Sequence, residues 1–152
     1  MQKIVCQDFK TLRKAYVEIK GFLEKQAFSD AKISLDTRIV QDLELYGDDN
    51  YFLLDEFITQ YHLDYENFYY GEHFLSEGEV YNPNLIFLLP VIIILFFIRL
   101  LSFGKITINL FSQKPKRTTL DMSFGDMLTW YLQGEYALRN EVKFVLKAPS
   151  LN

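Results

Sequence analysis

The sequence predicts a mainly α protein: a small helical bundle that is interrupted by an inserted hydrophobic helix, with a short β-hairpin as a further option. Apolar residues recur at helical spacing in three segments, residues 7–27, 48–62 and 120–132. One uninterrupted apolar run, residues 85–98, is much more hydrophobic than any other segment. Because this run lies between the second and the last periodic segments, we expect it to divide the bundle.

Composition fits one folded domain with an appendage. The chain has 152 residues, of which 16% are aromatic, and this argues against disorder. The net charge of −4 has the wrong sign for binding through phosphate contacts, so no nucleic-acid partner is expected. The single cysteine, Cys6, excludes an internal disulfide and a cysteine-rich metal cluster. Because Cys6 lies near the start of the first amphipathic segment, we expect a buried structural thiol.

The first periodic segment, residues 7–27, is expected to be a helix with its apolar stripe turned toward the core. The residues of this stripe are Phe9, Leu12, Tyr16, Ile19, Phe22 and Leu23. A loop rich in Ser, Asp and Thr follows, and we expect Leu35 and Ile39 to reach from it into the bundle.

The second helix is expected to start at Asp48 or Asp49 and to end near His62. A carboxylate at a helix start accepts backbone N–H bonds and interacts favourably with the helix dipole, so either residue could cap the helix. Its apolar face would comprise Tyr51, Leu54, Phe57, Ile58 and Tyr61. Residues 66–74 are aromatic and acidic, and both a short third helix and an irregular aromatic plug fit them.

The apolar run extends to Phe103 if Arg99 and Ser102 are allowed, which gives about the ~20 residues needed to cross a membrane. The expected membrane-contacting residues are Leu85, Phe87, Ile93, Phe96 and Phe97. A buried core helix is the alternative interpretation. Basic residues follow the run and acidic residues precede it, which would place the C-terminal side in the cytoplasm. A re-entrant or interfacial helix, kinked at Pro90, would instead keep both ends on one side.

Residues 105–110 alternate polar and apolar side chains, which predicts a short strand. The tail, residues 142–147, could form a second strand paired with it. Between them, Ser123 and Asp126 are spaced as a near capping box at the start of the last helix, residues 120–132. The predicted organisation is therefore residues 1–80 as the first part of the bundle, 83–104 as the hydrophobic helix, and 105–152 as strand, last bundle helix and tail.

The stretch Asp42-Leu43-Glu44-Leu45-Tyr46-Gly47-Asp48-Asp49, with the amphipathic run to Tyr61, resembles the start of the recognition helix of acyl carrier proteins. Asp42 and Leu43 match the opening pair of the carrier motif, and Gly47 falls on the serine that carries phosphopantetheine. Glu44 stands where carriers usually have glycine. The resemblance covers roughly residues 6–75 and returns at 120–134. The signature Gly47-Asp48-Asp49 is also similar to that of a bacterial family of carrier-like domains in which the serine is commonly absent.

The resemblance implies a carrier fold without the carrier chemistry, because Gly47 has no hydroxyl to modify. We expect no enzyme activity, no cofactor and no metal. An EF-hand reading starting at Asp42 fails, since Tyr46 and Leu53 occupy required ligand positions. Carriers meet basic partners through this helix, so the expected partner-binding residues are Asp48, Asp49, Asp55 and Glu56.

The expected function is therefore non-catalytic docking or scaffolding at a bacterial membrane, with the carrier-like part in the cytoplasm. The expected partners are an unidentified protein with a basic surface and membrane lipid. Two alternatives stay open: an acyl or lipid carrier that binds its chain non-covalently, and an immunity-type protein that sequesters a toxin.

Overall fold

A computed structural model describes residues 2–27, 32–75, 79, 90, 93, 94, 101 and 118–147. The chain divides into two compact units. The first unit combines Met1–Phe74 with Thr119–Asn152, and the second is Leu75–Thr118. The two units are described separately.

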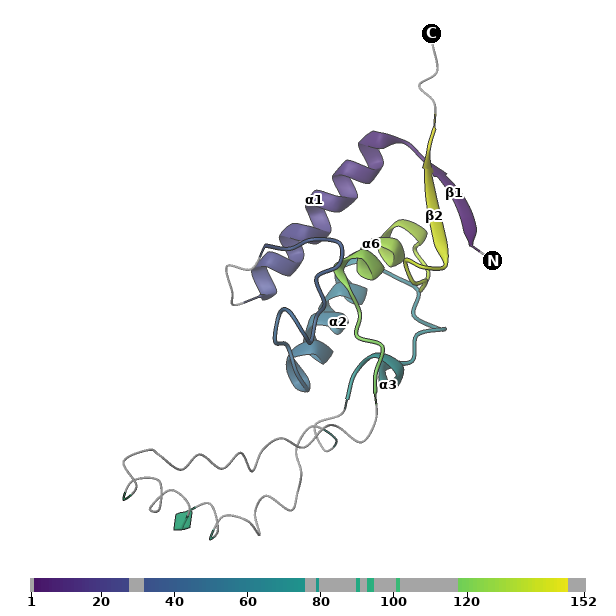
Figure 1. Ribbon diagram of the computed structural model, residues 1–152. Helices are drawn as coiled ribbons and strands as arrows, with labels where there is room; N and C mark the ends of the chain where they lie inside the picture. Colours follow the sequence, from purple (N-terminus) through teal and green to yellow (C-terminus); the bar gives the residue numbers. More distant parts are fainter. Residues whose placement is uncertain are drawn as a thin grey trace. The chain divides into compact units, whose positions relative to one another are not determined.

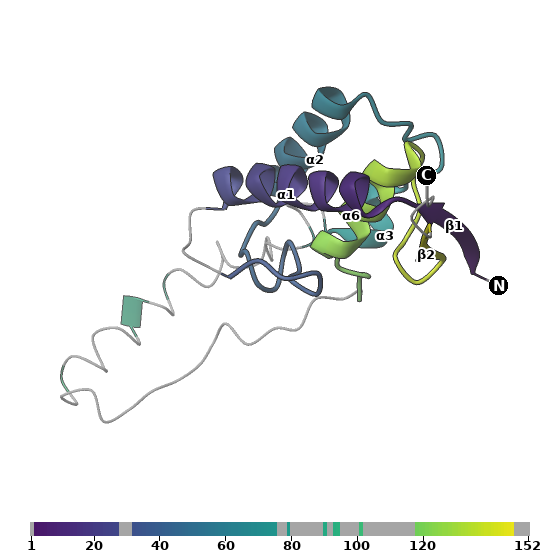
Figure 2. The same cartoon turned by 90° about the horizontal axis from the view of Figure 1, so that it is seen from above.

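The first unit is mainly helical, with one small sheet, as the sequence predicts (Figure 1). In chain order its elements are β1 (Lys3–Gln7), α1 (Phe9–Gln26), α2 (Asp48–Tyr61), α3 (Tyr70–His73), α6 (Phe124–Gln133) and β2 (Val142–Leu146). Helices α1 and α6 pack against each other, and the sheet lies beside the start of α1 in both views (Figures 1 and 2). The sequence segments before residue 75 and after residue 118 thus build one core.

Helix α1 begins directly after its N-cap residue, Asp8. The Asp8 carboxylate accepts a 2.9 Å hydrogen bond from the Thr11 backbone N–H, and the hydrogen bonds from Thr11 hold the pKa of this carboxyl below its usual value. Its buried residues are Ala15, Ile19, Phe22 and Leu23. Phe9, which we expected in the inward stripe, is instead 66% exposed. The first turn projects beyond the core, so the helical periodicity placed one residue too many inside.

The loop between α1 and α2 closes one side of the core. Ile39 is fully buried and Leu35 is half-buried against the core, as predicted. The Ile39 backbone N–H donates to the Met122 carbonyl at 3.0 Å, which joins this loop to the segment before α6. Leu43 and Leu45 are also buried, so the loop contributes as an apolar layer rather than as a solvated connection.

The centre of the core is aromatic. Trp130 of α6 and Phe57 of α2 are fully buried, and their ring centroids lie 5.9 Å apart in an edge-to-face arrangement. The Trp130 indole N–H donates to the Asp64 carbonyl at 2.9 Å, so this buried donor is satisfied. Leu63, just after α2, is buried, whereas Tyr65 is 62% exposed.

The described sheet joins the tail to the first strand. Val142–Leu146 is a strand, as predicted, and it pairs in parallel with Lys3–Gln7, in the register Lys3↔Val142. The proposed partner strand, residues 105–110, lies outside the described residues. Cys6 lies in β1 and is exposed, not buried in a helix. The capping residue Asp8 separates strand from helix, and the parallel partner lies more than 130 residues away, where local patterns carry no information.

The second unit contains the apolar run. Its described residues Pro90, Ile93, Ile94 and Leu101 are helical, and Ile93 is 54% exposed. Leu85, Phe87, Phe96 and Phe97 lie outside the described residues. Within the part of the chain that the structure describes, no helix combines the length and the apolarity needed to cross a bilayer.

Candidate docking surface on helix α2

Helix α2 begins at a glycine with an unusual backbone. Gly47 is the N-cap residue, with φ 56° and ψ −118°, and no side chain caps the helix. The prediction that Asp48 or Asp49 caps α2 is therefore wrong: both residues already lie in the first helical turn. Their carboxylates still interact favourably with the positive end of the helix dipole. The start of α2 is therefore defined by the backbone conformation of Gly47, without a side-chain cap.

A buried polar contact fixes this helix start from beneath. The Tyr70 hydroxyl of α3 donates to the Asn50 side-chain oxygen and lies 3.2 Å from the Gly47 carbonyl. Asn50 is almost fully buried, and its amide donates to the Leu45 carbonyl at 3.4 Å. Burial, with smaller contributions from Asp48 and Tyr51, raises the pKa of Tyr70, so this hydroxyl stays a proton donor. The start of α2 is held by α3 and by the preceding loop.

Glu44 also lies in a strained part of this loop. Its φ of 56° is in the left-handed region, where glycine is favoured. A residue with a side chain is strained at this φ, so the loop before α2 stores backbone strain at Glu44.

The four predicted partner-binding residues lie together on α2. Asp48, Asp49, Asp55 and Glu56 are all exposed, opposite the buried residues Asn50, Leu53, Leu54 and Phe57. Glu56 accepts a 2.6 Å hydrogen bond from Gln26 of α1. Among the described residues, no salt bridge joins any of the four to a basic side chain. Helix α2 therefore presents an uncompensated negative face.

Exposed aromatic rings lie on the same helix, and sequence reasoning missed them. Phe52 is 65% exposed and is three or four positions from each of the four carboxylates, so it lies among them on the helix surface. Tyr51, which we expected in the inward face, is 55% exposed, and its ring centroid lies 6.0 Å from that of Phe52. We define the α2 face as Asp48, Asp49, Tyr51, Phe52, Asp55 and Glu56. The only sequence signal for it was that Phe52 falls off the helical stripe of buried leucines.

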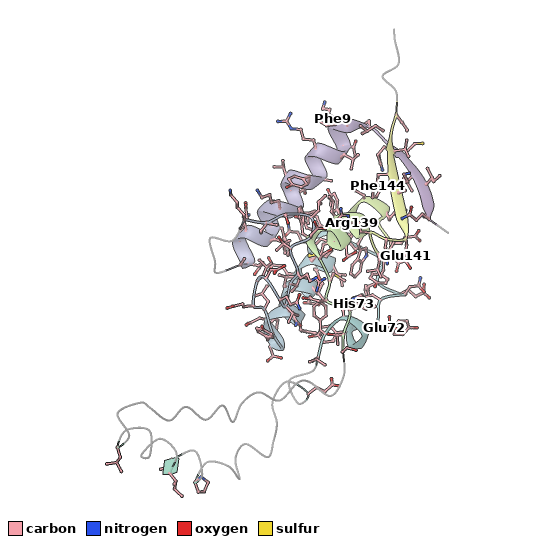
Figure 3. The ribbon with its side chains drawn as sticks, viewed as in Figure 1. Phe9, Glu72, His73, Arg139, Glu141 and Phe144 are labelled. Carbon is pink, nitrogen blue, oxygen red and sulfur yellow. The ribbon has the colours of Figure 1, made fainter. Side chains whose placement is uncertain are left out.

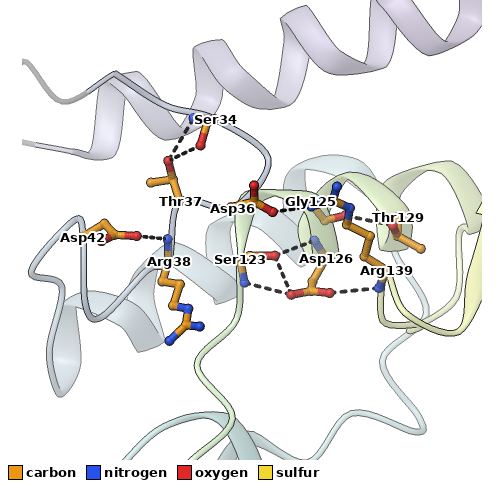
Figure 4. A network of polar contacts seen from close by, with 10 residues as sticks. All are labelled: Ser34, Asp36, Thr37, Arg38, Asp42, Ser123, Gly125, Asp126, Thr129 and Arg139. Carbon is orange, nitrogen blue, oxygen red and sulfur yellow. Dashed lines mark hydrogen bonds and ion pairs between the residues drawn. The ribbon is translucent and has the colours of Figure 1, made fainter.

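A second concentration of polar residues surrounds the start of α6 (Figure 4). Ser123 and Asp126 form the predicted capping box, and Asp126 also accepts from the Arg139 backbone N–H at 2.8 Å. The Arg139 guanidinium pairs with Asp36 at 2.7 Å. The Asp121 carboxylate accepts from the backbone N–H groups of Val40 and Gln41, and its pKa is raised, mainly by burial. These carboxylates hold the loop onto α6.

A shallow hollow of about 360 Å³ opens beside this network, lined in part by His73, Asp121 and Arg139. The His73 ring is buried: its Nδ1 donates to the Leu120 carbonyl at 2.6 Å, and its Nε2 accepts from the Tyr136 hydroxyl at 2.5 Å. Burial, followed by nearby carboxylates, raises the pKa of Tyr136 to about 12. Figure 3 shows His73 next to Glu72 of α3. Both ring nitrogens are occupied, so this histidine is a structural link.

In the described part of the chain, no group of three or more His, Cys, Asp or Glu side chains is arranged to hold a metal ion. Every buried side-chain nitrogen and oxygen among those residues has a hydrogen-bond partner. Comparisons with protein-family models, with curated proteins and with solved structures found no match to this chain.

Proposed function

We propose that this protein is a non-catalytic, acyl-carrier-like docking or scaffold protein at a bacterial membrane, and that the α2 face binds a protein with a basic surface. One observation carries this proposal: the exposed ring of Phe52 lies among four exposed carboxylates. The Phe52 ring keeps most of its apolar surface in water, and the uncompensated acidic residues repel one another along the helix. A basic partner with an apolar pocket relieves both costs.

The two kinds of group would do different work in such a complex. Aromatic side chains at the centre of an interface commonly supply much of the affinity, whereas surrounding charges guide association and select partners. Phe52 is the proposed anchor, with Tyr51 beside it. Asp48, Asp49, Asp55 and Glu56 are the proposed steering charges.

The start of α2 supports docking in place of covalent carriage. Phosphopantetheine attachment requires a hydroxyl, and Gly47 supplies none. Its φ of 56° with ψ of −118° is a combination that side-chain-bearing residues avoid, so a serine at this position would be strained. The polar contact between Tyr70 and Asn50 keeps this backbone in place.

Site-specific photocrosslinking of the full-length protein in its native cells would test this proposal. A crosslinking residue at position 52 should give one discrete adduct, whereas the same residue at Leu120, which is 67% exposed and does not belong to the α2 face, should not. Neutralising Asp48, Asp49, Asp55 and Glu56 to Asn or Gln should strongly reduce that adduct. Equal adducts from both positions, or an adduct that is indifferent to neutralisation, would contradict docking through α2.

Intact-mass analysis of the same protein separates docking from the carrier alternative. A phosphopantetheine-sized addition, or a lipid that copurifies in stoichiometric amount, would favour a carrier. An unmodified mass together with a position-specific adduct would favour docking.

A further inference from the structure

Helix α1 carries a charge pattern opposite to that of α2. It contains five basic and two acidic residues, whereas α2 contains four acidic residues and no basic one. Both acidic residues of α1 have partners: Glu24 pairs with Lys20 at 3.5 Å, and Glu18 accepts from the Tyr131 hydroxyl at 3.1 Å. Within the described residues, no salt bridge engages Lys10, Arg13 or Lys14. The first half of α1 is therefore a positive surface.

Apolar side chains are interleaved with these cations. Phe9 is 66% exposed and Val17 is 62% exposed. Helical spacing places Val17 and the three cations on the side of α1 that faces away from the buried residues Ala15 and Ile19, and Phe9 lies at the flank of that side, in the exposed first turn. We define the α1 face as Phe9, Lys10, Arg13, Lys14 and Val17. Figure 3 shows Phe9 at the outer end of α1, where the helix meets the sheet.

The adjoining sheet continues this character. In the parallel register, Ile4 lies beside Lys143, and Ile4 is 68% exposed. A two-stranded parallel sheet is unusual because parallel sheets are normally covered on both faces. An exposed isoleucine and an exposed lysine therefore lie side by side on the two strands of the sheet that adjoins the start of α1 (Figure 1).

We propose that the α1 face binds an anionic lipid surface. Clustered Lys and Arg side chains on a helix are attracted to anionic headgroups, and aromatic and aliphatic side chains between them enter the interface. The inference rests on the membrane location in the proposed function, for which the sequence offers the uncharged apolar run of residues 85–98. A chain tethered by that run would keep the α1 face at a high effective concentration near the headgroups.

Vesicle flotation of the full-length protein tests this inference. The protein is incubated with vesicles of phosphatidylcholine alone, and with vesicles that contain about 30% phosphatidylglycerol, at physiological salt. The test variant is Lys10→Gln/Lys14→Gln. The matched control is Lys25→Gln/Lys32→Gln, which removes the same charge from exposed positions beyond the α1 face. Circular dichroism confirms that both variants are folded.

We expect the test variant to lose about thirtyfold in affinity for the anionic vesicles, since each lysine near such a surface contributes ~1 kcal/mol. The control should lose much less, and affinity for neutral vesicles should not change. Phe9→Ser should weaken binding to the anionic vesicles further. Equal losses in test and control variants, or no preference of the protein for anionic lipid, would overturn the α1 proposal.

The outcomes separate this inference from the proposed function. If the protein binds neutral and anionic vesicles equally, only the α1 proposal fails, because membrane attachment itself survives. If the protein binds neither, the membrane part of the proposed function fails as well. If the test variant binds vesicles normally but loses concentration-dependent self-association, the α1 face binds the α2 face of a second copy, and the lipid proposal is wrong.

Discussion

Replacement of Gly47 tests two properties of the start of α2: a backbone conformation that requires glycine, and the absence of a side-chain hydroxyl. Its φ of 56° and ψ of −118° lie in a region that residues with a Cβ rarely adopt. Gly47→Ala should therefore lower the free energy of unfolding by about 1–3 kcal/mol, the usual cost of such backbone strain. At roughly 4 °C per kcal/mol, the Tm should fall by roughly 4–12 °C.

Gly21→Ala is the matched control for this substitution. Gly21 lies in the interior of α1, and no heavy atom lies within 4 Å of a Cβ built there. Alanine should stabilise this helical position by about 0.5–1 kcal/mol. Thermal and denaturant unfolding of the two variants should consequently give shifts of opposite sign. If Gly47→Ala stabilises the protein as Gly21→Ala does, the argument from backbone strain is refuted.

Gly47→Ser extends the test to chemistry. The variant supplies the hydroxyl that carriers use, but it should carry the same strain as alanine. Incubated with coenzyme A and a phosphopantetheinyl transferase, it should show no mass addition, with a genuine carrier protein as the positive control. Efficient modification would show that the missing hydroxyl alone separates this protein from functional carriers.

Three further substitutions test the structure at other points. Glu44→Gly should raise the free energy of unfolding by up to ~1 kcal/mol in denaturant titration, because glycine relieves the strain of a left-handed φ of 56°. A lower free energy of unfolding would show that the contacts of the Glu44 side chain stabilise the fold by more than the strain costs. Gly125→Ala should lower the free energy of unfolding by about 1–3 kcal/mol, because a Cβ there would lie 2.8 Å from the Leu35 carbonyl oxygen and 2.7 Å from Arg139 Cδ. An unchanged Tm would contradict this close approach. Tyr136 has a pKa raised from 10.0 to about 12, so the folded state retains a proton that the unfolded state releases, and stability should fall as the pH rises from 10 toward 12. Tyr136→Phe should flatten that part of the stability curve, and an unchanged slope would place the alkaline sensitivity elsewhere.

Much of the helical framework could be predicted from the sequence, because its signals are local. Helical spacing located α1, α2 and α6, and the pairing of Ser123 with Asp126 located the start of α6. The buried position of Ile39 also followed from its place in an apolar part of the loop. A capping box or an amphipathic stripe depends on residues within a few positions of each other, so one sequence contains the whole signal.

Tertiary structure decided the features that depend on distant or backbone-level contacts. The parallel pairing of Lys3 with Val142 joins the two ends of the chain, and no local pattern specifies it. Gly47 begins α2 with φ 56° and ψ −118°, angles that a glycine permits but that the sequence does not specify. The structure shows that Phe52 lies on the surface, because Leu53, Leu54 and Phe57 are the residues of α2 that fill the core. The sequence by itself determined which segments are helical and where acidic and basic residues cluster, whereas packing determined which of those residues remain exposed to meet a partner.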